Sequence, residues 1–302
     1  MQVPKAKDFS IKRYLHFLGG ILGIGGILFV FRRLLNAIDS MGSERLFQIP
    51  LTALFMLVVA YAVSNVLLAL AWRELLLCLG ETTVEHMQAI RIYALSQLAK
   101  YLPGNVFHLA GRQALGVAAG FSGKALVKSL LGELALISLA TVSFVFLALP
   151  ASSLGISLAL AFLFFGVFFC VILWLLERFL KTHVVRAFVF QFIFLALSGC
   201  LFIRCLTLFG ANVPVAIFFP TLATYVVAWL VGLVTPGAPA GLGVREAVLL
   251  FFLSGGIDES ALLFATVLMR IISILGDVLF YVATGVFGSF FVRAKSKVHV
   301  SR

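Results

Sequence analysis

The sequence predicts an all-α polytopic membrane protein of about eight transmembrane helices, because each helix needs about 20 apolar residues. Of its 302 residues, 62% are hydrophobic and only 12% are charged, and the mean hydropathy is +1.14. A soluble domain carries about twice that charged fraction. Too few polar residues are therefore present to cover a surface in water, whereas lipid tolerates an apolar surface. We expect a single integral membrane domain over residues 1–302.

Long apolar runs place most of these helices. They lie near residues 14–31, 50–71, 125–149, 156–176, 188–209, 214–234 and 260–290. The segment 84–101 is harder to assign, because its helical pattern contains charged and polar residues such as Glu85, Arg91 and Gln97. It either spans the bilayer with a polar stripe against protein or lies along the interface, where Lys100 would be an anchor. Counting this segment as a span gives eight.

The net charge of +11 reflects Lys and Arg residues at span ends and at both termini. This distribution is typical of membrane topology and of contact with anionic lipid, and no nucleic-acid partner is expected. Eight spans place both basic termini in the cytoplasm but put the loop with Arg178, Lys181 and Arg186 outside. Seven spans would put that loop inside and the basic C-terminal tail outside. We expect eight, in the plasma membrane (the inner membrane of a bacterium), with cytoplasmic termini.

Two stretches do not fit simple spanning helices, the first at 101–123 and the second at 235–256. Each has Pro-Gly near its start, at Pro103 and Gly104 in the first and at Pro236 and Gly237 in the second. Proline and glycine interrupt helices. In hydrocarbon an irregular backbone is tolerated only where it is buried in protein or lines a watery cavity. Each stretch is therefore predicted to be a broken, re-entrant or interfacial segment.

The two stretches match each other at an offset of 133 positions. The matched pairs are Pro103 with Pro236, Gly104 with Gly237, Leu109 with Leu242, Arg112 with Arg245, and Ala114 with Ala247. Paired segments that are interrupted by glycine and proline in two halves of a chain point to the binding site of a transporter. The sequence therefore predicts an internal repeat with a site where the two halves meet.

Arg112 and Arg245 are the strongest candidates for binding a substrate. A guanidinium is always charged and holds phosphate with a planar fork, and amide groups of a glycine-rich turn would point to the same place. The candidate binding residues are Pro103, Gly104, Asn105, His108, Arg112, Pro236, Gly237, Gly241, Gly243, Arg245 and Glu246. The alternative is that the two arginines only extend to the interface and fix helix ends.

Charged residues inside the apolar runs are candidates for lining or gating a cavity. They are Glu133, Arg270 and Asp277, and Arg204 lies inside another run. Ionisable groups in a bilayer cost several kcal/mol unless they are paired or hydrated, so they should face the bundle interior. Glu133 is expected to pair with Arg270 or Arg245. Such pairs would either serve function or only lock helices together.

No GxSxG, HExxH or Walker A motif is present in the sequence. The histidines are scattered and the cysteines form no CxxC pair. We therefore expect neither an enzyme nor a bound cofactor or metal.

Several of these residues resemble one known family. Residues 97–105 read QLAKYLPGN, and residues 236–247 read PGAPAGLGVREA; Trp72, Arg73, Glu74 and Arg270 also fit the resemblance. The chain is similar to the flippase-like transmembrane family of lysylphosphatidylglycerol synthase/flippase, over its membrane region only. The resemblance implies about eight spans with broken helices, and it carries no synthase activity to this chain. Residues 238–240, Ala-Pro-Ala, depart from the more glycine-rich turn that the family would have.

The resemblance implies a lipid flippase-like transporter. Its substrate would be a membrane lipid with an anionic phosphate headgroup, either an aminoacylated phospholipid or a polyprenyl-phosphate glycolipid. The alternative is a membrane enzyme or an accessory subunit in the synthesis of envelope glycolipids, working with a synthase or glycosyltransferase partner. A carboxylate facing water beside Arg112 or Arg245 would favour that alternative, and Glu246 is the strongest such candidate.

Overall fold

The computed structural model describes residues 49–300, apart from 83, 102–106, 152–154, 236–240 and 242, with side chains as far as residue 286 except those of 101 and 107. The expected span at 14–31 lies outside the described residues. The same is true of five candidate site residues, Pro103, Gly104, Asn105, Pro236 and Gly237.

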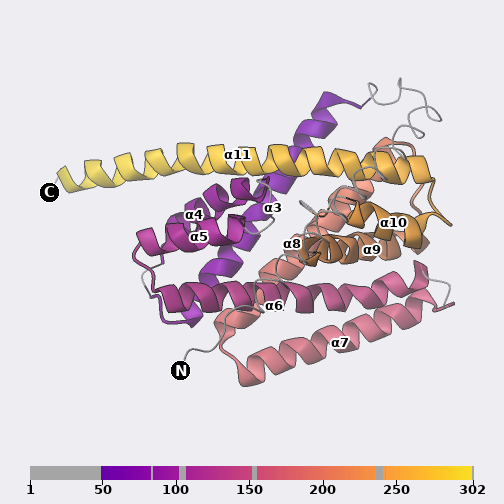
Figure 1. The fold of residues 1–302 in the computed structure, drawn as a ribbon, viewed down its shortest axis with the longest axis horizontal. Helices are drawn as coiled ribbons and strands as arrows, with labels where there is room; N and C mark the ends of the chain where they lie inside the picture. The colour runs from indigo at the N-terminus through magenta and orange to yellow at the C-terminus, as the bar shows by residue number, and fades with distance from the viewer. Residues whose placement is uncertain are drawn as a thin grey trace, which may run out of the picture.

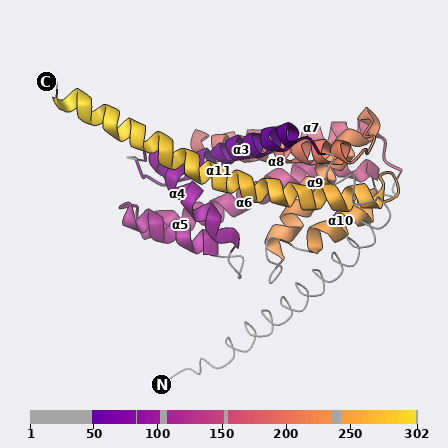
Figure 2. The same ribbon diagram turned by 90° about the horizontal axis from the view of Figure 1, so that it is seen from above.

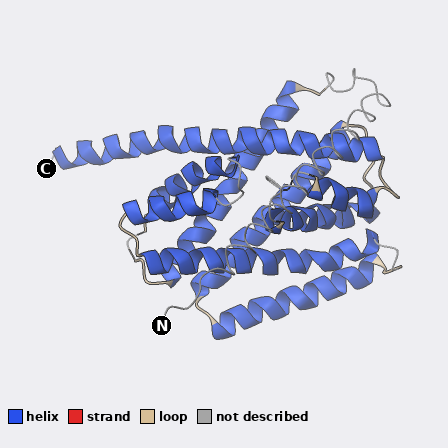
Figure 3. Ribbon diagram, viewed as in Figure 1, coloured by secondary structure: helices blue, strands red, loops and turns tan. Residues whose placement is uncertain are grey.

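The described residues form helices joined by loops, with no strand among them, which confirms the all-α prediction (Figure 3). The α-helices are α3 (Leu51–Cys78), α4 (His86–Leu98), α5 (Phe107–Ala118), α6 (Gly123–Ala148), α7 (Leu158–Phe179), α8 (Thr182–Leu208), α9 (Val215–Val234), α10 (Val244–Leu253) and α11 (Glu259–Val300). Short 3-10 turns follow α4 and α6, at Ala99–Tyr101 and Leu149–Ala151.

Among the described residues, six helices are long and apolar enough to cross a membrane: α3, α6, α7, α8, α9 and α11. They correspond to six of the predicted spans, so the chain is an integral membrane protein. Helix α4 has 13 residues. At a rise of about 1.5 Å per residue it is about 20 Å long, which is shorter than the hydrocarbon core. The segment 84–101 therefore does not form a helix of spanning length.

Local signals explain several helix ends. Ser122 and Ser157 precede α6 and α7, and their hydroxyl oxygens accept hydrogen bonds from backbone N–H groups of the first turn. A serine in this position satisfies a donor that the helix leaves unpaired. Helices α3 and α8 are each followed by a glycine with positive φ, Gly80 at 96° and Gly210 at 79°. This left-handed conformation suits glycine and ends both helices.

The order of helices occurs twice. We call α3–α6 the first helix set and α8–α11 the second helix set, with α7 between them in the chain. Helix α3 packs against α8. Other contacts between helices of the two sets, or within one set, come in matching pairs, such as α3 with α11 and α8 with α6, α4 with α11 and α9 with α6, and α4 with α5 and α9 with α10. Figure 1 shows that α3 runs antiparallel to α8 and α6 antiparallel to α11.

Short helices and close helix contacts shape the middle of the molecule. Helices α5 and α10, one from each set, lie on the same side of the long helices (Figure 2). Gly276 of α11 faces α3 so closely that a Cβ atom there would lie 2.6 Å from Cδ1 of Tyr61. Small residues allow such approach between membrane helices. Gly276 thus fixes the position of Tyr61, which faces the interior between the two sets.

Candidate functional site

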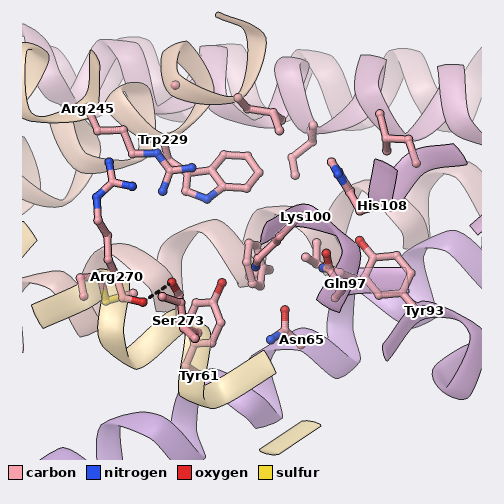
Figure 4. Close-up of a pocket in the computed structure, with 18 of the residues that line it drawn as sticks. Tyr61, Asn65, Tyr93, Gln97, Lys100, His108, Trp229, Arg245, Arg270 and Ser273 are labelled. Atoms are coloured by element: carbon pink, nitrogen blue, oxygen red, sulfur yellow. Dashed lines mark hydrogen bonds between the residues drawn. The ribbon is translucent and has the colours of Figure 1, made fainter. Parts of the chain in front are cut away.

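A cavity of about 300 Å³ lies between the two helix sets (Figure 4). Every helix of both sets contributes to its wall. Its size suits a polar headgroup, since small-molecule pockets measure about 300–1,000 Å³. The charged residues on its wall are Lys100, Arg112, Glu133, Arg245 and Arg270.

The wall is built from matching positions of the two sets. Pairs of lining residues that are 133 positions apart are Tyr61 and Phe194, Lys100 and Leu233, Arg112 and Arg245, Glu133 and Thr266, and Ile137 and Arg270. The rings of Tyr61 and Phe194 touch, with centroids 6.4 Å apart, where α3 packs on α8. The offset found around the two Pro-Gly turns therefore extends to the residues that enclose the cavity, and it brings both candidate arginines to one site.

Arg112, on α5, is neutralised by a buried carboxylate. Its side chain is only 2% exposed. Its Nη1 atom donates to Oε1 of Glu133 at 3.1 Å, and its Nη2 atom pairs with Oε2. The hydroxyl of Tyr93 donates to the same carboxylate at 2.9 Å, and the guanidinium lies 4.6 Å from the Tyr93 ring centroid. The expected pairing of Glu133 with Arg270 or Arg245 is wrong, because α5 places Arg112 against this carboxylate instead.

Arg270, on α11, is bound to the second broken segment. Its Nε atom donates to Oε1 of Glu246 at 2.9 Å, and its Nη2 atom donates to the carbonyl of Gly241 at 3.1 Å. Glu246 is 1% exposed, lies on α10 and does not line the cavity. The pair therefore ties α10 and the residues before it to α11.

Lys100 and Asp277 form a third ion pair. Asp277 of α11 is fully buried, and its Oδ1 atom accepts a hydrogen bond of 2.9 Å from Nδ2 of Asn65 on α3. Both partners, Lys100 and Asn65, come from the first helix set, whereas Asp277 belongs to the second. Lys100 is therefore part of the cavity wall and of a link between the sets, and the prediction of an interface anchor is wrong.

Arg245, on α10, makes no ion pair with the described residues. Its Nε atom is buried and has no hydrogen-bond partner among them. Its guanidinium lies 5.9 Å from the Trp229 ring centroid. Figure 4 shows the guanidinium groups of Arg245 and Arg270 near each other beside Trp229. The two like charges repel each other, and an anion between or beside them would offset that repulsion.

The charges around the cavity leave one positive charge over. In the part of the chain that the structure describes, four cations line it, and three carboxylates pair with three of these cations: Glu133, Glu246 and Asp277. Arg245 is the remaining cation. His108 on α5 adds no charge near neutral pH, because burial, and then the nearby charges of Arg112 and Lys100, lower its pKa to about 4. The cavity is therefore electropositive.

The glycines of the second broken segment allow close backbone approach. Gly241 and Gly243 have φ of 70° and 81°. A Cβ atom on Gly241 would lie 2.7 Å from the Cα atom of Gly232 on α9. Only glycine accommodates both the backbone conformation and the contact. These residues shape the segment that carries Arg245 rather than contact the cavity themselves.

Sequence reasoning missed several polar and aromatic residues of the wall. They are Tyr61, Asn65, Tyr93, Gln97, Lys100, Tyr225, Trp229 and Ser273. Asn65 could have been identified from the sequence as an amide inside an apolar run, because a polar side chain in a spanning helix faces protein rather than lipid. Arg204 was expected to face the interior, but its residue is exposed on the surface of α8.

The described residues contain no group of His, Cys, Asp and Glu side chains that could hold a metal ion. No family model matches the chain, and no curated protein shows significant similarity to it. The cavity is therefore the feature that bears on function.

Proposed function

We propose that this protein is a flippase-like transporter that moves a lipid with an anionic phosphate headgroup between membrane leaflets. The observation that carries this proposal is Arg245, a cation without an ion pair among the described residues on the wall of a cavity between the two helix sets. The acyl or prenyl tails would stay in lipid while the headgroup occupies the cavity. No covalent step is needed.

The chemistry of Arg245 favours phosphate. An unpaired charge at membrane depth is costly, and an anionic ligand offsets that cost. A guanidinium presents a planar fork that matches two phosphate oxygens. Arg270 lies beside it but already donates to Glu246 and to the carbonyl of Gly241. In this proposal Arg245 grips the phosphate, while Arg270 holds α10 in place and adds positive potential.

An inverted repeat would supply the movement. The two helix sets have the same order and matching contacts, and their long helices run in opposite directions (Figure 1). Transporters with inverted repeats alternate access by rocking one repeat against the other around a central site. We include in this proposal the expected span at 14–31, in addition to the six long helices, and re-entrant segments around Pro103 and Pro236.

The Lys100–Asp277 pair is the candidate gate. It joins the end of α4 to α11, and Asn65 of α3 bonds to the same carboxylate. The other two ion pairs around the cavity lie within one set each, Arg112 with Glu133 and Arg270 with Glu246. Away from the cavity wall, Glu74 of α3 also contacts His183 of α8. Rocking the sets apart would therefore break the contacts of Asp277 and leave the other two pairs intact.

The alternative, an enzyme or accessory subunit in glycolipid synthesis, needs a carboxylate that faces water beside one of the arginines. Glu133 is held by Arg112 and Tyr93, and Glu246 is buried against Arg270. Neither has the freedom of a general acid or base. Translocation requires only that the protein binds the headgroup and then changes conformation. The cavity would provide the binding, and rocking of the two helix sets would provide the movement.

Leaflet exchange in proteoliposomes tests the proposal. The full chain would be reconstituted with fluorescent phosphatidylglycerol, and a membrane-impermeant quencher would report the fraction of label in the outer leaflet over time. We expect exchange at least about tenfold faster than in protein-free vesicles, which corresponds to a barrier lowered by about 1.4 kcal/mol. The Arg204→Gln variant, altered at an exposed position of α8, should behave as the wild type. Folded protein that accelerates no phosphate lipid would contradict the proposal.

A further inference from the structure

We infer that the headgroup beyond the phosphate is uncharged and carries hydroxyl groups, as glycerol or a sugar does. This inference rests on the proposed function and narrows its substrate. The observation behind it is that the two ends of the cavity differ in charge and in hydrogen-bonding groups. One end holds Arg245 and Arg270. The other holds uncharged groups that both donate and accept hydrogen bonds (Figure 4), and the charged residues at that end, Lys100, Arg112 and Glu133, are each in an ion pair.

The arginine end would receive the phosphate. Arg245, Arg270 and Trp229 lie together there, on α10, α11 and α9. The phosphate of a diester carries one negative charge and suits a site with one positive charge in excess. Trp229 would pack against the glycerol or prenyl carbons next to the phosphate, since an indole offers a broad apolar face.

The other end would receive the rest of the headgroup. Asn65 is fully buried, and because its Nδ2 atom donates to Asp277, its Oδ1 atom is left without a hydrogen-bond partner among the described residues. In Figure 4 this side chain faces the same space as Gln97, Tyr93 and His108. The Nδ1 atom of His108 is also buried without a partner among them. The side chain of Gln97 likewise makes no hydrogen bond with the described residues.

Hydroxyl groups match these partners best. A hydroxyl donates one hydrogen bond and accepts others, so it satisfies an amide oxygen and an amide or imidazole N–H at the same place. A buried polar atom left unpaired is costly, so a ligand that pairs the Asn65 oxygen gains affinity over one that does not. A phosphate lipid without any group beyond the phosphate would leave that oxygen unpaired.

A cationic headgroup does not match. An ammonium group is stabilised most strongly by a free carboxylate. Each of the three carboxylates that the structure describes around the cavity is held by a cation of the protein: Glu133 by Arg112, Asp277 by Lys100 and Glu246 by Arg270. Arg245 adds repulsion. An aminoacylated phospholipid, one of the two substrates that the family resemblance suggests, is therefore the disfavoured one for this chain.

The test compares lipids that differ only beyond the phosphate. The full chain would be reconstituted with fluorescent phosphatidylglycerol, phosphatidylinositol, phosphatidic acid and lysyl-phosphatidylglycerol that carry identical tails. A polyprenyl-phosphate hexose would be a fifth arm, which tells a prenyl source of the headgroup from a diacyl source. We expect one of the hydroxylated lipids to exchange at least about tenfold faster than the lysyl ester and phosphatidic acid, since each lost hydrogen bond to a buried partner has a large effect on discrimination.

Two substitutions at Gln97 sharpen the comparison. Gln97→Met removes hydrogen bonding at similar volume and should slow the hydroxylated lipid about tenfold, with no change for phosphatidic acid. Gln97→Glu adds a carboxylate near Lys100 and should raise the relative rate of the lysyl ester. Arg204→Gln is the control for substitution as such. The wild-type panel decides the matter even where a Gln97 variant does not fold.

The outcomes separate the two proposals. Exchange of the lysyl ester as fast as phosphatidylglycerol would overturn the headgroup inference and leave translocation standing. Equal rates for phosphatidic acid and the hydroxylated lipids would do the same. If no lipid exchanges through folded protein, the proposed function itself is wrong, and the inference that rests on it is wrong too.

Discussion

Replacing Arg245 with glutamine is expected to slow the exchange of an anionic phospholipid at least about tenfold, because hydrogen bonds to a charged group contribute about 1.5–3 kcal/mol. Arg245 is the cation on the cavity wall that no described carboxylate neutralises. Glutamine keeps part of the volume and a hydrogen-bond donor but removes the charge and the planar fork. Leaflet exchange of fluorescent phosphatidylglycerol in proteoliposomes measures the effect.

Two further variants show whether the charge or the fork matters. Arg245→Lys keeps the charge without the bidentate geometry, so its exchange rate should fall between those of the wild type and the glutamine variant. Arg204→Gln removes an exposed arginine and should leave the rate unchanged. The role of Arg245 is refuted by a glutamine variant that exchanges lipid at the wild-type rate.

Replacing Arg112 with methionine is expected to lower the free energy of unfolding by about 3–5 kcal/mol, because it leaves a buried carboxylate unpaired. Arg112 is 2% exposed and Glu133 is 7% exposed, and the two side chains join α5 to α6. Tyr93 would remain as the only described hydrogen-bond donor to the Glu133 side chain. Unfolding of the purified protein in mixed micelles with increasing denaturing detergent measures the loss.

A double variant tests the cause of that loss. Arg112→Met with Glu133→Leu removes both charges, so it should be more stable than Arg112→Met alone. The two effects should therefore be strongly non-additive, as expected for residues in direct contact. Additive effects, or a single methionine variant as stable as the wild type, would show that the pair is not the main polar link of α5.

The long helices could be predicted from the sequence because each apolar run is both long and continuous. The run at 188–209 became α8, Thr182–Leu208, and the run at 214–234 became α9, Val215–Val234. The segment 84–101 was ambiguous because its helical pattern does not show at which residue the helix ends. Helix α4 ends at Leu98 and is followed by a 3-10 turn at Ala99–Tyr101.

The two arginines could also be predicted as a pair, because the offset between the Pro-Gly turns places them at equivalent positions. Their different environments could not. Glu133 on α6 pairs with Arg112. The matching position on α11 is Thr266, which is uncharged and cannot neutralise Arg245. Only the packing of α5 and α10 decides which arginine is neutralised and which remains without a carboxylate.

Partners of the buried charges were the least predictable part. Asp277 bonds to Lys100 and Asn65, which are 177 and 212 positions away in the chain. Sequence spacing within one helix carries no information about such contacts, since they depend on how α11 crosses α3 and α4. The same is true of Arg204, whose position inside an apolar run did not reveal that it lies on the outer surface of α8.

Native mass spectrometry of the protein released from lipid would show whether Arg245 binds a lipid phosphate in the cavity between the helix sets. Wild type, Arg245→Gln and Arg204→Gln would be loaded with phosphatidylglycerol and released under identical conditions. We expect one tightly held lipid on the wild type and on Arg204→Gln, and its loss from Arg245→Gln. Equal retention of that lipid by all three proteins would contradict this role of Arg245.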